Sequence, residues 1–122
     1  MDRELIHEIN SHTFQVWEFI VKRNPELIRY QMPSVTLNGR LWRTAGLCYQ
    51  RLAIVQLGSK FFAQGHTRYM LEVILPHEII HYADYCLFGE SELHCGHGMG
   101  WQFLMRQYGL PPDPYHSMRI TR

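Results

Sequence analysis

The fold of this chain is organised around the stretch Leu75-Pro76-His77-Glu78-Ile79-Ile80-His81-Tyr82, which contains the pattern His-Glu-x-x-His. On an α-helix, residues four apart lie on the same face, about one turn from each other. His77 and His81 can therefore direct their imidazole nitrogens to one ion, at the distance of about 2.0–2.1 Å that is typical of zinc. Glu78 follows the first histidine directly and can reach a metal-bound water without ligating the metal. The spacing predicts a catalytic Zn2+ site with Glu78 as the general base.

The residues around this pattern decide between a metal site and a chance match. A chance match would bury two histidines and a glutamate in an apolar helix without a shared partner, which costs several kcal/mol. A bound metal ion would satisfy all three side chains together. We therefore interpret the stretch as a metal-binding helix of the core, whose apolar neighbours are Val73, Ile74, Leu75, Ile79, Ile80 and Leu87.

The composition is that of an ordinary globular protein. A length of 122 residues suffices for one domain, so we expect a single domain over residues 1–122. Hydrophobic residues make up 46% of the chain and charged residues 19%, which are usual values. The formal net charge of +1 excludes the strong overall basic character that many nucleic-acid-binding proteins have.

The cysteines and the N-terminus indicate a compartment. Cys48, Cys86 and Cys95 are odd in number and form no Cys-x-x-Cys pair, which argues against a disulfide framework and against a zinc ribbon. The first residues are charged and lack the apolar segment of a secretory signal. No apolar run approaches the ~20 residues that a membrane span needs. We therefore expect a cytoplasmic protein without a membrane partner.

Periodicity and turn residues predict an α+β domain with an N-terminal helix, a small three-stranded sheet, the metal-binding helix and a following C-terminal helix. The strands are expected to form a meander, because Asn38-Gly39 is a strong turn signal. The metal-binding helix is expected to start at an N-cap, Thr67, to end at Gly89 and to be kinked by Pro76. The other elements are predicted at 2–23, 34–37, 41–49, 52–57 and 99–108.

A zinc site of this kind needs a third protein ligand. The polar loop before the last helix offers His94, Cys95 and His97. The extended pattern His-Glu-x-x-His-x-x-Gly-x-x-His does not apply, because Asp84 and Leu87 occupy its glycine and last histidine positions. The last predicted helix contains no acidic residue that could serve instead. The residues alone leave the choice among the three loop side chains open.

Two blocks of sequence resemble the SprT-like metallopeptidase family, which includes SprT and the Spartan proteases. They are Val73–His81 and His97–Met105, and the second is similar to the His-Gly-x-x-aromatic element of the family. The histidine of that element is the third zinc ligand in the family. The resemblance therefore implies that His97, and not His94, joins the two helix histidines as a metal ligand.

The resemblance also implies a fold and an activity. Thr44–Cys48 and Ile54–Leu57 are similar to the two strands before the metal helix of the family, so the likeness covers about residues 34–111. It implies a minimal zincin-like domain and a zinc metallopeptidase with a protein substrate. In the family the substrates are proteins crosslinked to DNA, so DNA is an implied partner. SprT carries a four-cysteine zinc ribbon and Spartan a long partner-binding tail, and this sequence shows neither, which leaves recruitment to DNA open.

The charge pattern does not decide between this role and two others. The basic residues can form a face that contacts the DNA backbone, but they can equally be solvated surface charges. The alternatives to a DNA-linked protease are a non-catalytic metal-binding adaptor and a hydrolase of small peptides or other amides. The oligomeric state is not determined by the sequence. The basic residues in question are Arg40, Arg43, Arg51, Lys60 and Arg68.

Four further side chains are candidates for supporting roles. Asp84 lies on the same helical stripe as the two helix histidines and either orients a ligand's second nitrogen or is a solvated acid. Tyr82, Tyr115 and His116 are candidates for stabilising an oxyanion, with packing or a surface position as the alternative. An extended substrate is expected to pair with an exposed edge of the small sheet.

Overall fold

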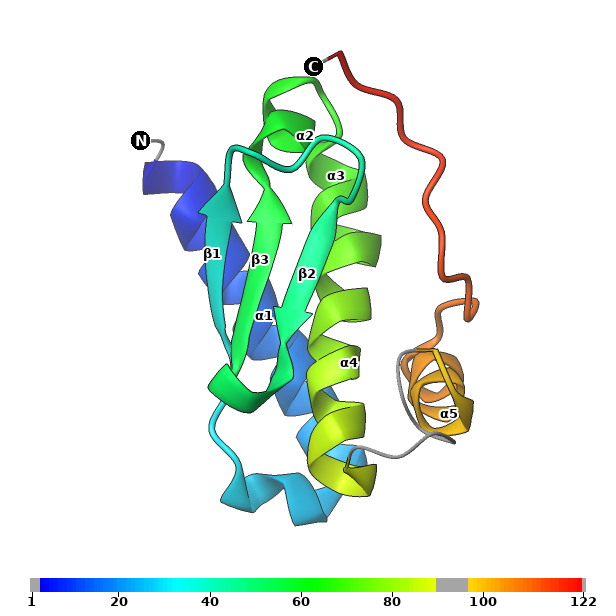
Figure 1. Cartoon of the computed structure of the whole chain (residues 1–122). Helices are drawn as coiled ribbons and strands as arrows, with labels where there is room; N and C mark the ends of the chain where they lie inside the picture. Colours follow the sequence, from blue (N-terminus) through cyan, green and yellow to red (C-terminus); the bar gives the residue numbers. More distant parts are fainter. Residues whose placement is uncertain (1–2, 90–96, 122) are drawn as a thin grey trace.

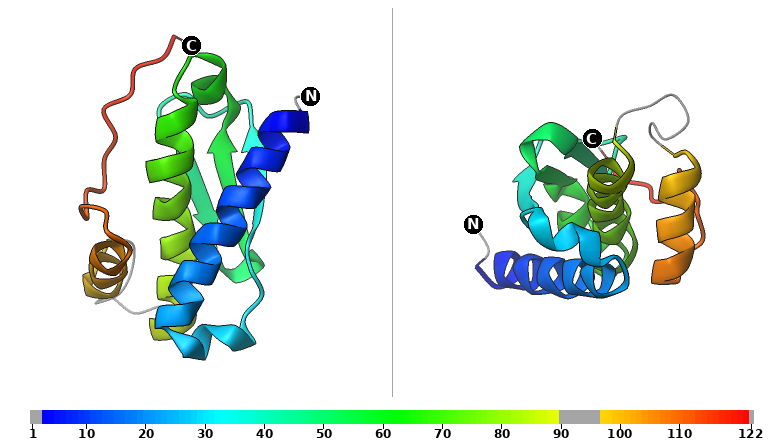
Figure 2. Two further views of the ribbon diagram at one scale, coloured as in Figure 1. Left: turned by 180° about the vertical axis from the view of Figure 1, so that it is seen from behind. Right: turned by 90° about the horizontal axis from the view of Figure 1, so that it is seen from below.

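Three strands and a long helical rod form the centre of the fold (Figure 1). The computed structural model of the chain describes residues 3–89 and 97–121. Helices α1 and α4 cover one face of the sheet, and α5 packs against α4 (Figure 2). The predicted α+β class is confirmed. In chain order the elements are α1 (Arg3–Arg23), η1 (Pro25–Arg29), β1 (Ser34–Asn38), β2 (Gly46–Tyr49), η2 (Gln50–Leu52), β3 (Ile54–Gly58), α2 (Ser59–Ala63), α3 (Thr67–Tyr69), η3 (Met70–Ile74), α4 (Leu75–Phe88) and α5 (Met99–Tyr108).

The strand order of the sheet is β1-β3-β2, so the predicted meander is wrong. Strand β3 lies in the centre, parallel to β1 with Ser34 opposite Ile54, and antiparallel to β2 with Gly46 opposite Leu57. Both Val55 and Leu57 of β3 are fully buried. The central position suits β3 because a strand with neighbours on both sides and a helix layer on its face has little contact with water.

The segment after β1 explains why no hairpin forms. The expected turn is present, since Asn38 Oδ1 accepts a hydrogen bond of 2.9 Å from the backbone N–H of Arg40. The turn leads into a loop, so the strand predicted at 41–49 is shortened to Gly46–Tyr49. The chain thereby crosses to the other side of β3, and β2 becomes an edge strand in contact with α4.

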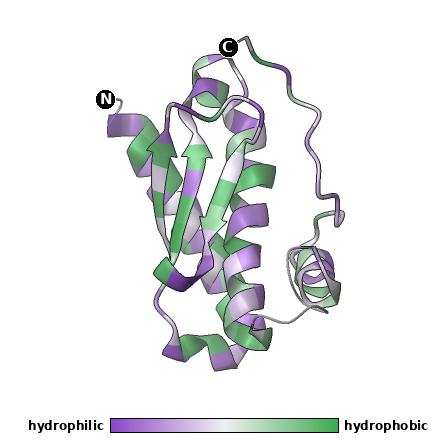
Figure 3. Ribbon diagram, in the orientation of Figure 1, coloured by the Kyte–Doolittle hydropathy of each residue, from purple (hydrophilic) through white to green (hydrophobic). Residues whose placement is uncertain are grey.

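The core lies between the sheet and helices α1, α4 and α5. Figure 3 shows hydrophobic and hydrophilic residues alternating around α1, as a helix with one buried face requires. Among the described residues, none of the helices combines the length and the apolar character that crossing a membrane requires. The largest fully buried side chains include Ile20, Leu27, Leu57, Phe61, Met70, Leu75, Ile79, Ile80, Trp101, Leu104 and Met105.

The helical rod consists of α3, the π-helical turn η3 and α4 in direct succession. Its N-cap is His66, so the predicted N-cap at Thr67 is wrong by one residue. A kink is predicted at Pro76, and the structure has a π-helical turn, Met70–Ile74, directly before this part of the rod. Proline donates no backbone hydrogen bond and crowds the carbonyl four residues before it, and a wider turn relieves both effects. Gly89, with a φ angle of 70°, ends α4 as predicted.

The segment after α5 has no regular structure and runs back along the rod toward α2 (Figure 1). The side chain of Gln64 exchanges two hydrogen bonds of 2.7 Å with the backbone carbonyl and N–H groups of Thr121. His116 Nε2 lies 2.8 Å from the carbonyl oxygen of Arg43, which ties the segment to the loop before β2. The segment therefore forms a fixed wall beside the rod and close to the edge of the sheet.

Candidate metal centre

Three histidines converge at one point, His77 and His81 from α4 and His97 from the turn before α5. The Nε2 atoms of His81 and His97 lie 3.1 Å and 3.3 Å from Nε2 of His77. The three potential ligand atoms lie within 4.8 Å of one another. Nitrogens bound to a tetrahedral zinc ion at ~2.0–2.1 Å would be about 3.3 Å apart. The donor set and the two distances from His77 therefore fit zinc.

The protonation of the imidazoles also suits metal binding. Burial lowers the pKa of His77 to about 4, and the neighbouring His97 adds to this effect while Asp113 opposes it. Burial lowers the pKa of His97 as well. The neutral imidazole is the form that binds a metal. Nε2 of His77 has two close neighbours, the Nε2 atoms of His81 and His97. An imidazole nitrogen takes part in only one hydrogen bond, so hydrogen bonds between the rings cannot account for both contacts.

His97 reaches the other two histidines because α5 packs closely on α4. Gly100 lies in the first turn of α5 and is buried. A Cβ atom at this position would lie 2.2 Å from Oδ1 of Asp84 and 2.6 Å from Cδ2 of Phe88. Glycine thus sets the approach of the α5 N-terminus to α4, and with it the position of His97. The only sign of this role in the sequence is a glycine three residues after a candidate ligand.

Trp101 forms a floor beneath all three imidazoles. Its side chain is fully buried. The indole ring stacks on His81 with a centroid separation of 5.2 Å and an interplanar angle of 15°. It meets His77 and His97 edge-on, at 4.9 Å and 4.5 Å. Such contacts restrict the rotation of the imidazole rings, a supporting role that helical spacing alone does not reveal.

Glu78 lies beside the histidines and under the first residue of β2. Its side chain is buried, and Oε2 lies 3.8 Å from Nε2 of His77. A Cβ atom at Gly46 would lie 2.8 Å from Cγ and 3.2 Å from Oε2 of Glu78, so glycine allows the strand to close over the carboxylate. Burial raises the pKa of Glu78 to about 8. A cation among the histidines would favour the ionised form.

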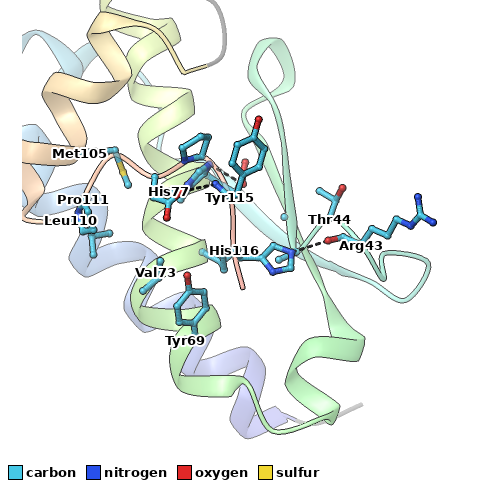
Figure 4. Close-up of a pocket in the computed structure, with 16 residues that line it drawn as sticks. Arg43, Thr44, Tyr69, Val73, His77, Met105, Leu110, Pro111, Tyr115 and His116 are labelled. Atoms are coloured by element: carbon cyan, nitrogen blue, oxygen red, sulfur yellow. Dashed lines mark hydrogen bonds and ion pairs between the residues drawn. The ribbon is translucent and has the colours of Figure 1, made fainter. Parts of the chain in front are cut away.

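Two adjoining cavities meet at His77 and Glu78. The larger, of about 580 Å³, lies between the loop before β2, the rod and the segment after α5 (Figure 4). The smaller, of about 300 Å³, is lined by all three histidines and by residues of β2. An extended chain lying along the edge strand would therefore pass over the histidines and the carboxylate.

The remaining candidates occupy different positions. Asp84 is buried between α4 and α5, so the alternative of a solvated acid is wrong. Tyr82 lines neither cavity, and its hydroxyl donates a hydrogen bond of 2.9 Å to the carbonyl oxygen of Gln31. Tyr115 and His116 line the larger cavity. The two other candidates for a third ligand lie outside the described residues; they are His94 and Cys95.

Comparison with known proteins shows which family the chain belongs to. The chain is similar to Protein SprT of Vibrio parahaemolyticus, with 29% identity over 93 residues that cover 75% of this chain and 53% of that protein. It thus spans about half the length of this curated relative. No solved structure matches the chain significantly. The model of the SprT-like family matches residues 3–117, which is nearly the whole chain, and this protein therefore belongs to the SprT-like family.

Proposed function

We propose that this protein is a zinc-dependent metalloendopeptidase in which Glu78 is the general base. The observation that carries the proposal is the convergence of three imidazoles beside the buried carboxylate of Glu78. When bound, zinc would polarise the scissile carbonyl group and lower the pKa of its water. The ligands would be His77, His81 and His97, and contact with Trp101 would keep their rings in orientation.

The side chains around the site would manage the proton and the charge of the reaction. Glu78 would accept the proton of the attacking water and pass it to the leaving amine. Gly46 would let the strand backbone cover the carboxylate, which limits its contact with bulk water. Tyr115 lines the larger cavity and is 80% exposed, so it remains a candidate for stabilising the oxyanion. His116 is already engaged with the Arg43 carbonyl.

A protein substrate would bind along β2 in an extended conformation. Strand β2 is at the edge of the sheet, and within the described residues no other strand pairs with its outer side. The backbone N–H and C=O groups on that outer side can pair with a substrate segment. Such a segment would cross both cavities and lie over Glu78. Backbone pairing of this kind favours flexible or unfolded segments of a protein.

We further propose that the substrates are proteins associated with DNA or crosslinked to it, so that the activity serves the repair of DNA–protein crosslinks. Membership of the SprT-like family supports this. Arg40 and Arg43 are both exposed in the loop that leads into β2, where they could contact a DNA backbone. Arg51 lies in η2 at the other end of β2, and Arg68 is paired with Glu72 at 3.1 Å. Lys60 donates a hydrogen bond to the carbonyl oxygen of Gly39, beside Arg40, so Arg51 and Arg68 are the two that lie apart from this loop. The family supports the DNA partner more strongly than the charges do.

Metal analysis and proteolysis of variants test the enzyme. Wild type and Glu78→Gln are expected to bind one zinc ion each, while the variant loses turnover by about 10²- to 10⁴-fold. His97→Ala is expected to lose zinc, with His94→Ala as its control. Zinc retained by His97→Ala and lost by His94→Ala would overturn the ligand assignment. Full biological activity of zinc-loaded Glu78→Gln would favour the non-catalytic adaptor.

The role of DNA is tested separately. A DNA-binding protein is offered as the substrate with and without single-stranded DNA, and cleavage is expected to depend on the DNA. Equal cleavage under both conditions, together with turnover of short peptides, would favour a general peptide or amide hydrolase.

A further inference from the structure

One end of the larger cavity is apolar, and none of the residues there takes part in the proton transfers proposed for Glu78. Of the three histidines only His77 lines this cavity, together with Glu78, so the cavity extends to one side of the metal position. We propose that its apolar end is a specificity pocket for a bulky apolar side chain of the substrate residue that directly follows the scissile bond. This inference rests on the proposed peptidase function. The apolar walls are Ile74 and five residues labelled in Figure 4: Tyr69, Val73, Met105, Leu110 and Pro111.

The walls of this pocket come from three parts of the chain and are held by the core. Tyr69 lies in α3, Ile74 in η3 and Met105 in α5. Ile74 and Met105 are only 6% and 1% exposed, so their positions are fixed by packing. Leu110, from the segment after α5, packs against the same core. A preformed cavity of about 580 Å³ is large enough for one side chain and the backbone next to it.

The direction of β2 determines which substrate residue faces this pocket. Thr44 and Gly46 line both cavities, but only the larger cavity also reaches Arg43 and Ala45, which precede β2. Only the smaller cavity reaches residues further along the chain, namely Leu47, Cys48 and Gln50. An antiparallel ladder is the more stable pairing for a strand added to an edge. A substrate running antiparallel to β2 would place the residues after the scissile bond near Gly46. The side chain directly after the bond would then enter the apolar end.

The chemistry of the lining predicts which side chains bind. Arg43 points out of the cavity in Figure 4, and its guanidinium group lies 4.7 Å from the ring centre of Trp42. A leucine side chain would exchange water for apolar contacts with the walls. An asparagine side chain of nearly the same size would lose hydrogen bonds to water, and glycine would leave the space unfilled. We expect a preference for leucine over either residue of about 10- to 100-fold.

Binding of three matched hydroxamates to the zinc-loaded protein tests the pocket without requiring turnover. The compounds are succinyl hydroxamate peptides that differ only in the substituent placed beside the zinc-binding group: isobutyl, carbamoylmethyl or hydrogen. Titration calorimetry is expected to show that the isobutyl compound binds about 10- to 100-fold more tightly than the other two. Equal affinities, or no binding despite one bound zinc ion, would overturn the inference.

A charge placed in the wall gives a second readout. Val73 is half-buried and lines the pocket, and Val73→Glu is expected to abolish the preference for isobutyl and to favour a basic aminobutyl substituent. Ile28→Glu makes the same change in charge at a residue that is 83% exposed and lines neither cavity, and it should keep the wild-type order. Thermal unfolding shows whether each variant is folded. If Val73→Glu does not fold, Val73→Ala, which widens the pocket without adding a charge, is tested in its place.

The peptidase function and the pocket can fail separately. Cleavage of peptides with leucine or asparagine after the scissile bond is followed by mass spectrometry in parallel. An isobutyl preference without any cleavage would reject the peptidase and leave an apolar binding pocket beside the metal, without the proposed role in selecting the cleavage site. Cleavage that is indifferent to this residue, with equal hydroxamate affinities, would reject the pocket and keep the peptidase.

Discussion

Replacement of Gly100 by alanine sets helix propensity against the packing of α5 on α4. In an open helix this replacement stabilises by about 0.5–1 kcal/mol. Here the new Cβ atom would lie 2.2 Å from Asp84 Oδ1 and 2.6 Å from Phe88 Cδ2, well inside contact distance. Phe88 is 43% exposed and can rotate, but Asp84 is 3% exposed and is held by its surroundings. The start of α5 therefore has to move, and such overpacking costs about 1–3 kcal/mol, which leaves a net loss of up to about 2.5 kcal/mol.

The same movement displaces His97 from the other two histidines. We expect Gly100→Ala to lower the Tm of the metal-free protein by about 2–8 °C and the affinity for zinc by about 10- to 100-fold. Differential scanning calorimetry and competition with a chromophoric chelator measure the two effects. Gly39→Ala is the control, because its Cβ atom would lie 3.5 Å from Ser59 Oγ, an ordinary contact. A Gly100→Ala protein with a raised Tm and unchanged zinc affinity would refute the reasoning.

Three further predictions concern the side chains around the site. Trp101→Leu removes the aromatic ring that contacts all three histidines and is expected to lower zinc affinity by at least about 10-fold. Trp101→Phe keeps an aromatic ring, so its loss of zinc affinity should be smaller. Competition with a chelator measures both affinities, and equal losses would contradict this role of Trp101. Gly46→Ala pushes Glu78 from its place and is expected to lower kcat by about 10- to 100-fold with zinc retained, so an unchanged kcat would show that the carboxylate tolerates the shift. Burial raises the pKa of Glu78 from 4.5 to about 8. Between these two pH values the side chain is ionised in the unfolded chain but still protonated in the folded, metal-free protein. Stability of the metal-free protein therefore falls as the pH rises from about 7 to 8, and urea unfolding is expected to show a smaller fall for Glu78→Gln; identical slopes would argue against a buried, protonated carboxyl group.

Short-range rules account for the parts of the site that lie on one helix. The period of an α-helix brings His77 and His81 to one face and places Glu78 next to them, whatever surrounds the helix. Gly89 and Gly109 end α4 and α5 with φ angles of 70° and 100°, because glycine adopts such angles without strain. These features depend on a few neighbouring residues, so the sequence by itself determines them.

The tertiary structure decides the features that depend on distant segments. The order β1-β3-β2 reflects which strand is most fully covered, and a turn signal at Asn38-Gly39 carries no information about that competition. Likewise, motif resemblance nominates His97, but the close packing of α5 on α4 brings its ring to the other two. The burial of Asp84 and the floor formed by Trp101 arise from the same packing. Each depends on which surfaces meet after the chain has folded, and local sequence patterns do not contain that information.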